Sequence, residues 1–360
     1  MTGFAATAPP ARPAPIDWPN ASRRVHFEAW LGHVAARHGI RAETLAPASA
    51  DASFRRYFRV QTTTGPLIVM DAPPPLEDVR PFVHVAGLID AAGLHGPRVL
   101  EADAAQGFLL LTDLGNRLYI DALRDDGGAH ADTLMRDATR ALLQWQARVP
   151  ADQLPPYDEA LLSRELALFP EWCVQREFGV VWTAAEHDAW GRICRLLMDS
   201  ALAQPTVAVH RDWMPRNLMV ADPNPGILDF QDAVRGPITY DLASLLRDAF
   251  LSWDEERELD WAVRYWQQAR RACLPLGDTL GHDFGEFWRA LEWMGLQRHL
   301  KVLGIFCRLK HRDGKPHYAD DLPRFFGYAQ RVAMRYVPLA PLVRLLAPLS
   351  GNAVSTGLTF

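Results

Sequence analysis

Patterns of apolar residues divide the first third of the chain into helices and strands. Helical spacing predicts a helix over residues 22–38, with Ser22 as its N-cap and Gly39 as its stop. Strand patterns follow over 43–49, where the signal is weak, 54–61 and 66–71. Next we expect a helix over 76–92, its first turn set apart by Pro81, and then strands over 97–101 and 107–112.

From Asp113 onward the apolar spacing is mainly that of helices. These are predicted over 130–148, 158–178, 184–203, 239–252, 254–273, 284–310 and 321–335. Residues 205–232 interrupt the pattern with short strands and loops. We therefore expect a leader over 1–21, a small mixed lobe over 22–113 and a large helical lobe over 114–360.

Composition narrows the class of protein. The 360 residues are 49% hydrophobic and carry a net charge of −5 without a long basic run, which argues against a nucleic-acid binder. The start of the chain has no signal-peptide pattern, and we find no apolar stretch long enough to span a membrane. The cysteines lack metal-binding spacing and are expected to be reduced thiols. We therefore predict a cytoplasmic protein with no membrane contact and no obligatory protein partner.

The interrupting segment carries the candidate chemistry. It contains His210-Arg211-Asp212, then Asn217 five residues after the aspartate, and a second strand that ends in Asp229. Phosphoryl transfer needs a carboxylate at the acceptor hydroxyl and oxygen ligands that hold Mg²⁺ on the phosphates. A loop of this spacing places Asp and Asn on one turn, and a hairpin returns the second Asp beside them.

This segment resembles the aminoglycoside phosphotransferase family, which is related to the protein kinases. The likeness follows most of the chain in order, and it is specific in the catalytic loop, DFQDA and YDLA. The phrases SFRRYFRV, LIVMDAPP, GFLLLTDLG and HRDWMPRNLM look most like the bacterial kinases of N-acetylmuramate and N-acetylglucosamine. The resemblance implies an α+β, two-lobed protein-kinase-like fold. It also implies ATP and Mg²⁺ as cofactors and a sugar substrate that receives phosphate on its anomeric C1 hydroxyl, in the recycling of cell-wall sugars.

The resemblance also implies a role for individual residues. Asp212 is expected to be the base, Asn217 and Asp229 the metal ligands, and Asp241 a brace for the catalytic loop. His210 is expected to shape that loop. Arg211 is expected to form a structural ion pair, because the chain has no activation loop whose phosphate it could bind. Candidate contacts with the substrate are Trp213, by stacking on a sugar face, Arg216, by facing a carboxylate or pairing with a nearby acid, and Asp232, by assisting metal or substrate or by an orienting hydrogen bond.

The nucleotide side departs from the family pattern. The glycine-rich loop is missing, and Met70 stands where kinases carry the phosphate-binding lysine. The expected nucleotide contacts are Ser53, Phe54, Arg55, Arg56, Leu111 and Asp113, with backbone groups of 109–113 at the adenine. Either the protein is a degenerate binding module, or one of Arg55, Arg56 and Arg59 replaces the lysine. The intact base and metal ligands favour the second explanation. Glu77 or Asp78, the acid that would pair with the lysine, is then expected to be solvated.

Two alternatives to a sugar kinase stay open. One is a kinase of another small molecule, of the aminoglycoside, choline or homoserine type. The other is a catalytically dead nucleotide-binding protein, suggested by Met70. A polycationic aminoglycoside would need an acidic pocket, whereas the stretch in and beside the catalytic loop carries Arg211, Arg216, Arg235 and Arg247. This charge favours a neutral or anionic acceptor.

Overall fold

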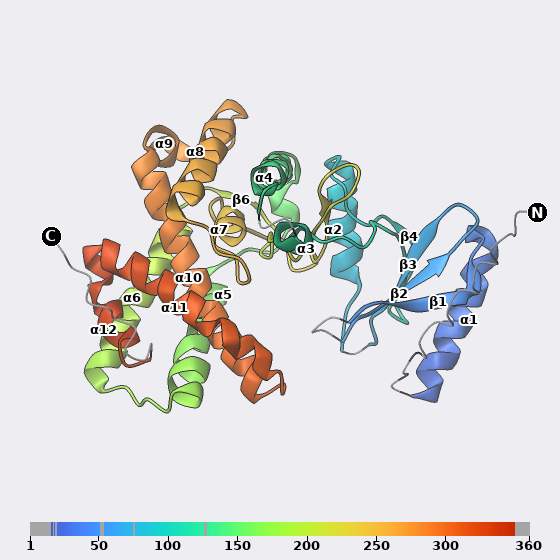
Figure 1. The fold of residues 1–360 in the computed structure, drawn as a ribbon, viewed down its shortest axis with the longest axis horizontal. Helices are drawn as coiled ribbons and strands as arrows, with labels where there is room; N and C mark the ends of the chain where they lie inside the picture. Colours follow the sequence, from blue (N-terminus) through green and yellow to red (C-terminus); the bar gives the residue numbers. More distant parts are fainter. Residues whose placement is uncertain are drawn as a thin grey trace, which may run out of the picture. The chain divides into compact units, whose positions relative to one another are not determined.

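A computed structural model describes residues 16, 18, 20–50, 54–74, 76–125 and 128–349 (Figure 1). These residues belong to two compact units. The small unit runs up to Asp90 and includes Gly96–Gly115, and the large unit comprises Ala91–His95 and the chain from Asn116 onward. In the described ranges, no helix has the length and apolar character needed to cross a membrane.

The small unit is built on an antiparallel sheet. Five described strands pair in the order β1-β2-β3-β5-β4. Their bounds are β1 (Arg41–Ala50), β2 (Arg56–Gln61), β3 (Pro66–Asp71), β4 (Val99–Asp103) and β5 (Phe108–Thr112). The strand patterns in the sequence therefore predicted the sheet correctly, because alternating side chains report directly which residues face the core.

Helix α1 (Ala21–His38) covers one face of this sheet. Its buried side chains pack with alternate residues of the central strands, in a cluster of Phe27, Leu31, Val34, Phe58, Val60, Val69, Phe108 and Leu110. The N-cap is Asn20, whose side chain accepts a hydrogen bond from the Arg23 N–H at 2.7 Å, so the prediction of Ser22 was wrong by two positions. The predicted stop is confirmed, since Gly39 adopts the left-handed conformation that ends a helix (φ 60°).

Helix α2 (Arg80–Ala91) begins later than its apolar pattern predicted. Pro81 lies in its first turn, where the missing N–H has no partner in any helix and therefore costs nothing. Residues 76–79 precede the helix as turn and loop.

The large unit is mostly helical (Figure 1). The predicted helices are present as α4 (Ala131–Arg148), α5 (Glu159–Leu168), α6 (Ala184–Leu202), α7 (Tyr240–Leu246), α8 (Glu255–Arg271), α10 (Phe284–His311) and α11 (Leu322–Arg335). Two predictions were too long: the pattern over 158–178 splits into α5 and a π-helix, η2 (Phe169–Glu177), and α7 ends at Leu246. The short helices α3 (Tyr119–Asp125), α9 (Gly277–His282) and α12 (Ala340–Leu346) were not predicted, because so few turns give little periodic signal.

Helix α10 is the centre of this unit, with most of its residues buried. It packs against α5, η2, α6, α7 and α11. The core between them contains the aromatic group Phe169, Trp182 and Trp190, whose ring centroids lie 5.3–6.3 Å apart. Several tryptophans of the large lobe are therefore core residues, as their helical spacing indicated.

Candidate active site

Two short ladders shape the catalytic segment. Strand β6 (Thr206–Val209) pairs with β9 (Val234–Pro237), and β7 (Leu218–Met219) pairs with β8 (Gly226–Ile227). His210 therefore follows directly after one ladder, and Asp229 follows shortly after the other. The predicted layout of a loop and a returning hairpin is present.

The side chain of Asn217 connects the two acids of the predicted site. Its Nδ2 donates to the backbone oxygen of Asp212 at 3.0 Å and lies 3.4 Å from Oδ2 of Asp229. Asp229 has a positive φ of 60°, and its Oδ1 accepts a hydrogen bond from Gln231 Nε2 at 2.8 Å. Asn217 thus holds Asp212 and Asp229, which are 17 positions apart in the sequence, in one group.

Asp241 is fully buried beneath the catalytic loop. Its two carboxylate oxygens accept hydrogen bonds from the backbone N–H groups of His210 at 2.7 Å and Arg211 at 2.9 Å. Burial raises the pKa of Asp241 to about 7, against the opposing effect of these two donors. This is the geometry that a brace for the loop requires.

His210 is also fully buried and packs edge-on against Trp145 and Trp213. Burial lowers its pKa to about 4, although the nearby Asp212 acts in the opposite direction. The ring is therefore neutral near pH 7, and its Nδ1 accepts a hydrogen bond from the Asp212 N–H at 3.3 Å. These contacts fit a residue that shapes the loop.

The three expected substrate contacts differ in exposure. Trp213 is fully buried, so its ring does not offer a face to a sugar, and the expectation that it stacks on the substrate was wrong. Arg216 is exposed, and its guanidinium lies 4.3 Å from the ring centroid of Phe250. Asp232 is exposed too, with Oδ2 3.4 Å from Gln231 Nε2.

The arginines of the small unit have distinct partners. Arg56 bonds to the buried Asp71 through two nitrogens. Arg59 does the same with Asp113, and its terminal NH2 nitrogen (Nη2) also lies 2.7 Å from the carbonyl oxygen of Gly115. Arg59 meets both oxygens of Asp113, which is the strong bidentate arrangement, whereas both nitrogens of Arg56 bond to the same oxygen, Oδ2, of Asp71.

Arg55 instead lies beside Glu77, with 3.6 Å between its Nε and Oε2 of the glutamate. The side chain of Glu77 is only 21% exposed, so the expectation that it is solvated was wrong. Asp78 is paired with Arg80 at the surface. Phe54 is 63% exposed, and Ser53 lies outside the described residues.

Met70 is completely buried on β3, and Leu111 on β5 is also buried. Leu111 has partners on both sides, Ile68 of β3 and Val99 of β4, so its backbone lies between two ladders. The Thr112 N–H donates to the backbone carbonyl oxygen of Arg98 at 3.1 Å. The N–H of Thr112 is therefore already engaged within the sheet and is not available to hold adenine.

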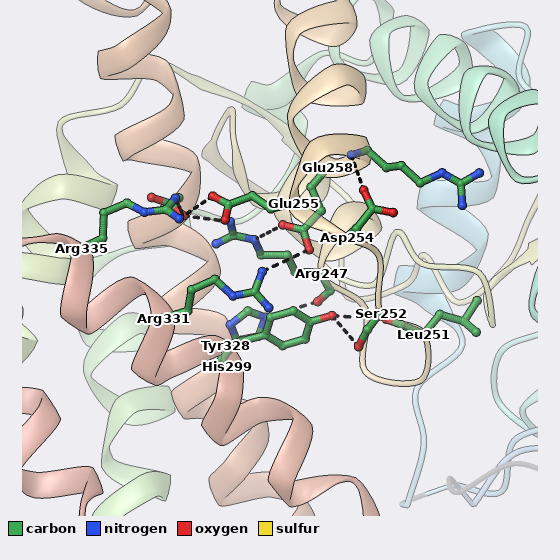
Figure 2. A network of polar contacts seen from close by, with 12 residues as sticks. Arg247, Leu251, Ser252, Asp254, Glu255, Glu258, His299, Tyr328, Arg331 and Arg335 are labelled. Atoms are coloured by element: carbon green, nitrogen blue, oxygen red, sulfur yellow. Dashed lines mark hydrogen bonds and ion pairs between the residues drawn. The ribbon is translucent and has the colours of Figure 1, made fainter. Parts of the chain in front are cut away.

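Sequence reasoning missed the buried charges that surround the catalytic segment. Arg211 and Arg247 were counted among the positive charges near the acceptor, but both are engaged in ion pairs, as was expected for Arg211 alone. Arg211 pairs with Glu165 at 2.6 Å, and Arg247 pairs with Glu258 at 3.0 Å and Glu292 at 2.9 Å. Figure 2 shows Arg247 within this second group of charges. Because the charges of Arg211 and Arg247 are already neutralised, the arginines favour a neutral or anionic acceptor less strongly than the sequence indicated.

One feature of the sequence, its scarcity of lysine, could have drawn attention to the ion pairs of Glu165 with Arg211 and Lys301. The chain has 38 Lys and Arg residues, yet its only lysines are Lys301, Lys310 and Lys315. Lys301 is buried and lies 2.8 Å from Oε1 of Glu165. A lysine that is buried in a chain that otherwise uses arginine indicates a position where the compact ammonium group is needed.

Comparison with known proteins agrees with this geometry. The sequence profile of the phosphotransferase enzyme family matches residues 44–276. A protein of Pseudomonas aeruginosa named N-acetylmuramate/N-acetylglucosamine kinase is 53% identical over 309 residues, which cover 86% of this chain and 89% of the relative. A protein of Pseudomonas putida with the same name is 52% identical over 313 residues, covering 87% and 90%.

The fold is shared with more distant kinases of known structure. The crystal structure of an amicoumacin kinase in complex with AMP-PNP and Ca²⁺ aligns with a TM-score of 0.56 at 14% identity, covering 87% of this chain and 94% of that one. The predicted α+β, kinase-like fold is confirmed by this likeness and by the antiparallel sheet joined to a helical unit. With a matching profile over most of its length and relatives of more than 50% identity, the chain belongs to the phosphotransferase enzyme family.

Proposed function

We propose that this protein transfers the γ-phosphoryl group of ATP to the anomeric C1 hydroxyl of N-acetylmuramate and N-acetylglucosamine. The carrying observation is that the Asp212, Asn217 and Asp229 group occurs in a chain about half identical, over most of its length, to relatives named as kinases of these two sugars. In this proposal the small unit binds the nucleotide, and the large unit carries the acceptor and the base. The proposed reaction takes place in the cytoplasm, where ATP is available.

Asp212 is the proposed general base. Its carboxylate would accept the proton of the sugar hydroxyl as the oxygen attacks phosphorus. An anomeric hydroxyl is more acidic than an ordinary alcohol, so a carboxylate of modest basicity suffices. The brace from Asp241 holds the backbone N–H groups of His210 and Arg211, the two residues that precede this base.

Asn217 and Asp229 are the proposed holders of Mg²⁺. Both offer side-chain oxygen, the ligand type that Mg²⁺ prefers, and Mg²⁺ needs only one or two carboxylates because it keeps water. Among the described residues, no cluster of three or more His, Cys, Asp or Glu exists that would suit a more demanding metal. Mg²⁺, when bound, neutralises charge on the phosphates. The AMP-PNP and Ca²⁺ in the amicoumacin kinase complex support the use of a nucleotide and a divalent ion.

Arg55 is the proposed replacement for the missing lysine. Arg56 and Arg59 each hold a carboxylate of their own unit through two nitrogens, which leaves Arg55 as the best of the three candidates. Its contact with Glu77, close to the start of α2, reproduces the acid–base pairing that orients the phosphate-binding lysine in protein kinases.

The test is an assay of ATP turnover with each sugar, with phosphorus NMR of the product. N-acetylglucosamine and N-acetylmuramate should give sugar 1-phosphates, and the 1-O-methyl glycoside of N-acetylglucosamine should be inert. Removal of divalent ions by EDTA should abolish turnover, and added Mg²⁺ should restore it. Turnover of the methyl glycoside would show that another hydroxyl is the acceptor. Turnover of kanamycin or choline, with no activity on either sugar, would replace the sugar with another acceptor.

A further inference from the structure

The backbone of Arg211 adopts a conformation that an ordinary residue avoids. Its φ of 77° lies in the left-handed region, which costs free energy for a residue with a side chain, so its surroundings must hold it there. The Arg211 N–H donates to Asp241, and the guanidinium reaches Glu165 of α5 at 2.6 Å. The residue that precedes the proposed base is therefore held at both its backbone and its side chain.

Glu165 is buried and saturated with partners. Its Oε1 lies 2.6 Å from Arg211 and 2.8 Å from Nζ of Lys301. Its Oε2 accepts hydrogen bonds from the hydroxyl of Tyr157 and from Nε2 of Gln297, the latter at 3.3 Å. Burial acts to raise the pKa of Glu165, but Lys301 and Arg211 outweigh it and bring the pKa to about 2. The carboxylate is thus ionised at any pH where the protein works.

Lys301 extends this cluster to the other side of the loop. It comes from the central helix α10, and its Nζ donates to the hydroxyl of Tyr240 at 3.2 Å. Tyr240 directly precedes Asp241, the residue that accepts the N–H groups of His210 and Arg211. Glu165 and Lys301 together therefore contact the catalytic loop at Arg211 and the start of α7 at Tyr240.

The charge at Arg211 has a counterpart in regulated protein kinases. There the arginine before the catalytic aspartate is neutralised by a phosphorylated residue, and activity depends on that modification. Here the anion is a glutamate that belongs to the fold. No added group is needed to neutralise the arginine, because the carboxylate of Glu165 already lies 2.6 Å from it.

We propose that Glu165, held by Lys301, is a positioning residue for the transfer reaction: it supplies the permanent negative charge that fixes Arg211 and, through it, Asp212. The inference rests on the proposed role of Asp212 as the base. It assigns to α5 and α10 a kinetic function in addition to their part in the core.

The first test compares two glutamates of the same chemistry. In Glu165→Gln, kcat should fall by about 10-fold or more while the KM for ATP and for sugar changes less than threefold. The matched control is Glu177→Gln, which removes a carboxylate held by Lys310 at 2.6 Å and His311 at 2.7 Å. Glu177 also pairs η2 with α10, and both of these partners lie on α10 rather than in the catalytic loop. Its variant should keep kcat within twofold. Equal losses of kcat in both variants, or full kcat in Glu165→Gln, would overturn the proposal.

The second test asks whether Glu165 acts through Arg211. In a double-mutant cycle, Glu165→Gln should cost less than a further twofold in kcat once Arg211→Gln is present, because the group it positions is gone. Independent effects that multiply would contradict the proposed route.

The third test needs no turnover. Hydrogen exchange of the peptide that contains residues 208–217 should accelerate in Glu165→Gln and not in Glu177→Gln, since the loop loses its anchor. Unchanged exchange would overturn the proposal even if the acceptor were not a sugar. Failure of the proposed function, in contrast, would show in the wild-type acceptor assay and leave the exchange result intact.

Discussion

Arg211 lies in the catalytic loop and Arg247 follows α7, and each forms ion pairs with glutamate from other helices. Arg211 is 18% exposed and shares Glu165 with Lys301. Arg247 is 3% exposed, and its partners Glu258 and Glu292 are completely buried. Around Arg247 the network continues to α11, where Arg335 contacts Glu292 at 2.7 Å. Figure 2 shows Arg335 beside its other partner, Glu255.

The two arginines differ in what their backbones do. The backbone N–H of Arg211 is one of the two that Asp241 holds, and the next residue is the proposed base. Arg247 is the C-cap residue that follows α7, and its carbonyl oxygen lies 3.3 Å from Nε2 of the buried His299. Similar ion pairs therefore support different properties. We expect the Arg211 cluster to govern rate and the Arg247 cluster to govern stability.

The largest expected effect is at the base itself. Asp212→Asn should lower kcat by about 10²-fold or more, as general-base contributions usually do, while the affinity for ATP is retained. Steady-state kinetics with N-acetylglucosamine would measure it, and Asp188→Asn, an exposed carboxylate on α6, is the control. If Asp212→Asn turned over at the wild-type rate, no cluster that positions this residue would have a kinetic role.

Removal of Arg247 tests the stability side. Arg247→Ala leaves two buried carboxylates without this partner, which should lower the free energy of unfolding by about 3–5 kcal/mol. Urea denaturation would measure it, and kcat per folded molecule should stay within about threefold. Arg331→Ala is the control, because its contact with Glu258 is long, at 4.0 Å, and partly exposed, so its loss should cost less than about 1 kcal/mol. A large fall in kcat at full stability would erase the proposed difference between the two arginines.

Acid titration should separate the charge of Glu165 from its packing. Its pKa is near 2 in the folded protein, below the ordinary value of 4.5, so the ionised group adds stability that is complete above pH 4.5 and disappears as the pH falls toward 2. A shift of this size corresponds to about 3 kcal/mol. The stability difference between wild type and Glu165→Gln should therefore shrink over this window. A difference that is constant from pH 6 to pH 3 would mean that the charge contributes nothing to stability.

The smallest effect is expected in the small unit. Arg55→Ala should raise the KM for ATP, or lower kcat, by more than tenfold, which matches the loss of one charge-assisted hydrogen bond of about 1.5–3 kcal/mol. Arg24→Ala removes an exposed arginine of α1 from its pair with Glu28 and should change neither constant. A silent Arg55→Ala would mean that the phosphate charge comes from another group.

Much of the fold and the core of the candidate site could be predicted from the sequence. Apolar periodicity located the five strands and the long helices, because both periods are local and survive in the order of residues. The spacing from Asp212 to Asn217 and on to Asp229 predicted the group that the hairpin brings together. Short-range patterns could not decide between two nearby residues that can both cap a helix: Ser22 was predicted as the N-cap of α1, and Asn20 is the cap.

Only the tertiary structure decided which charges meet and which side chains are accessible. Nothing in the sequence separates Glu165, which lies 2.6 Å from Arg211 across 46 positions, from Glu177, which binds elsewhere. Trp213 adjoins the base in the sequence and is nevertheless buried, since its exposure depends on the packing around His210. The physical reason is that periodicity records which face of an element is covered, whereas an ion pair depends on which elements cover it.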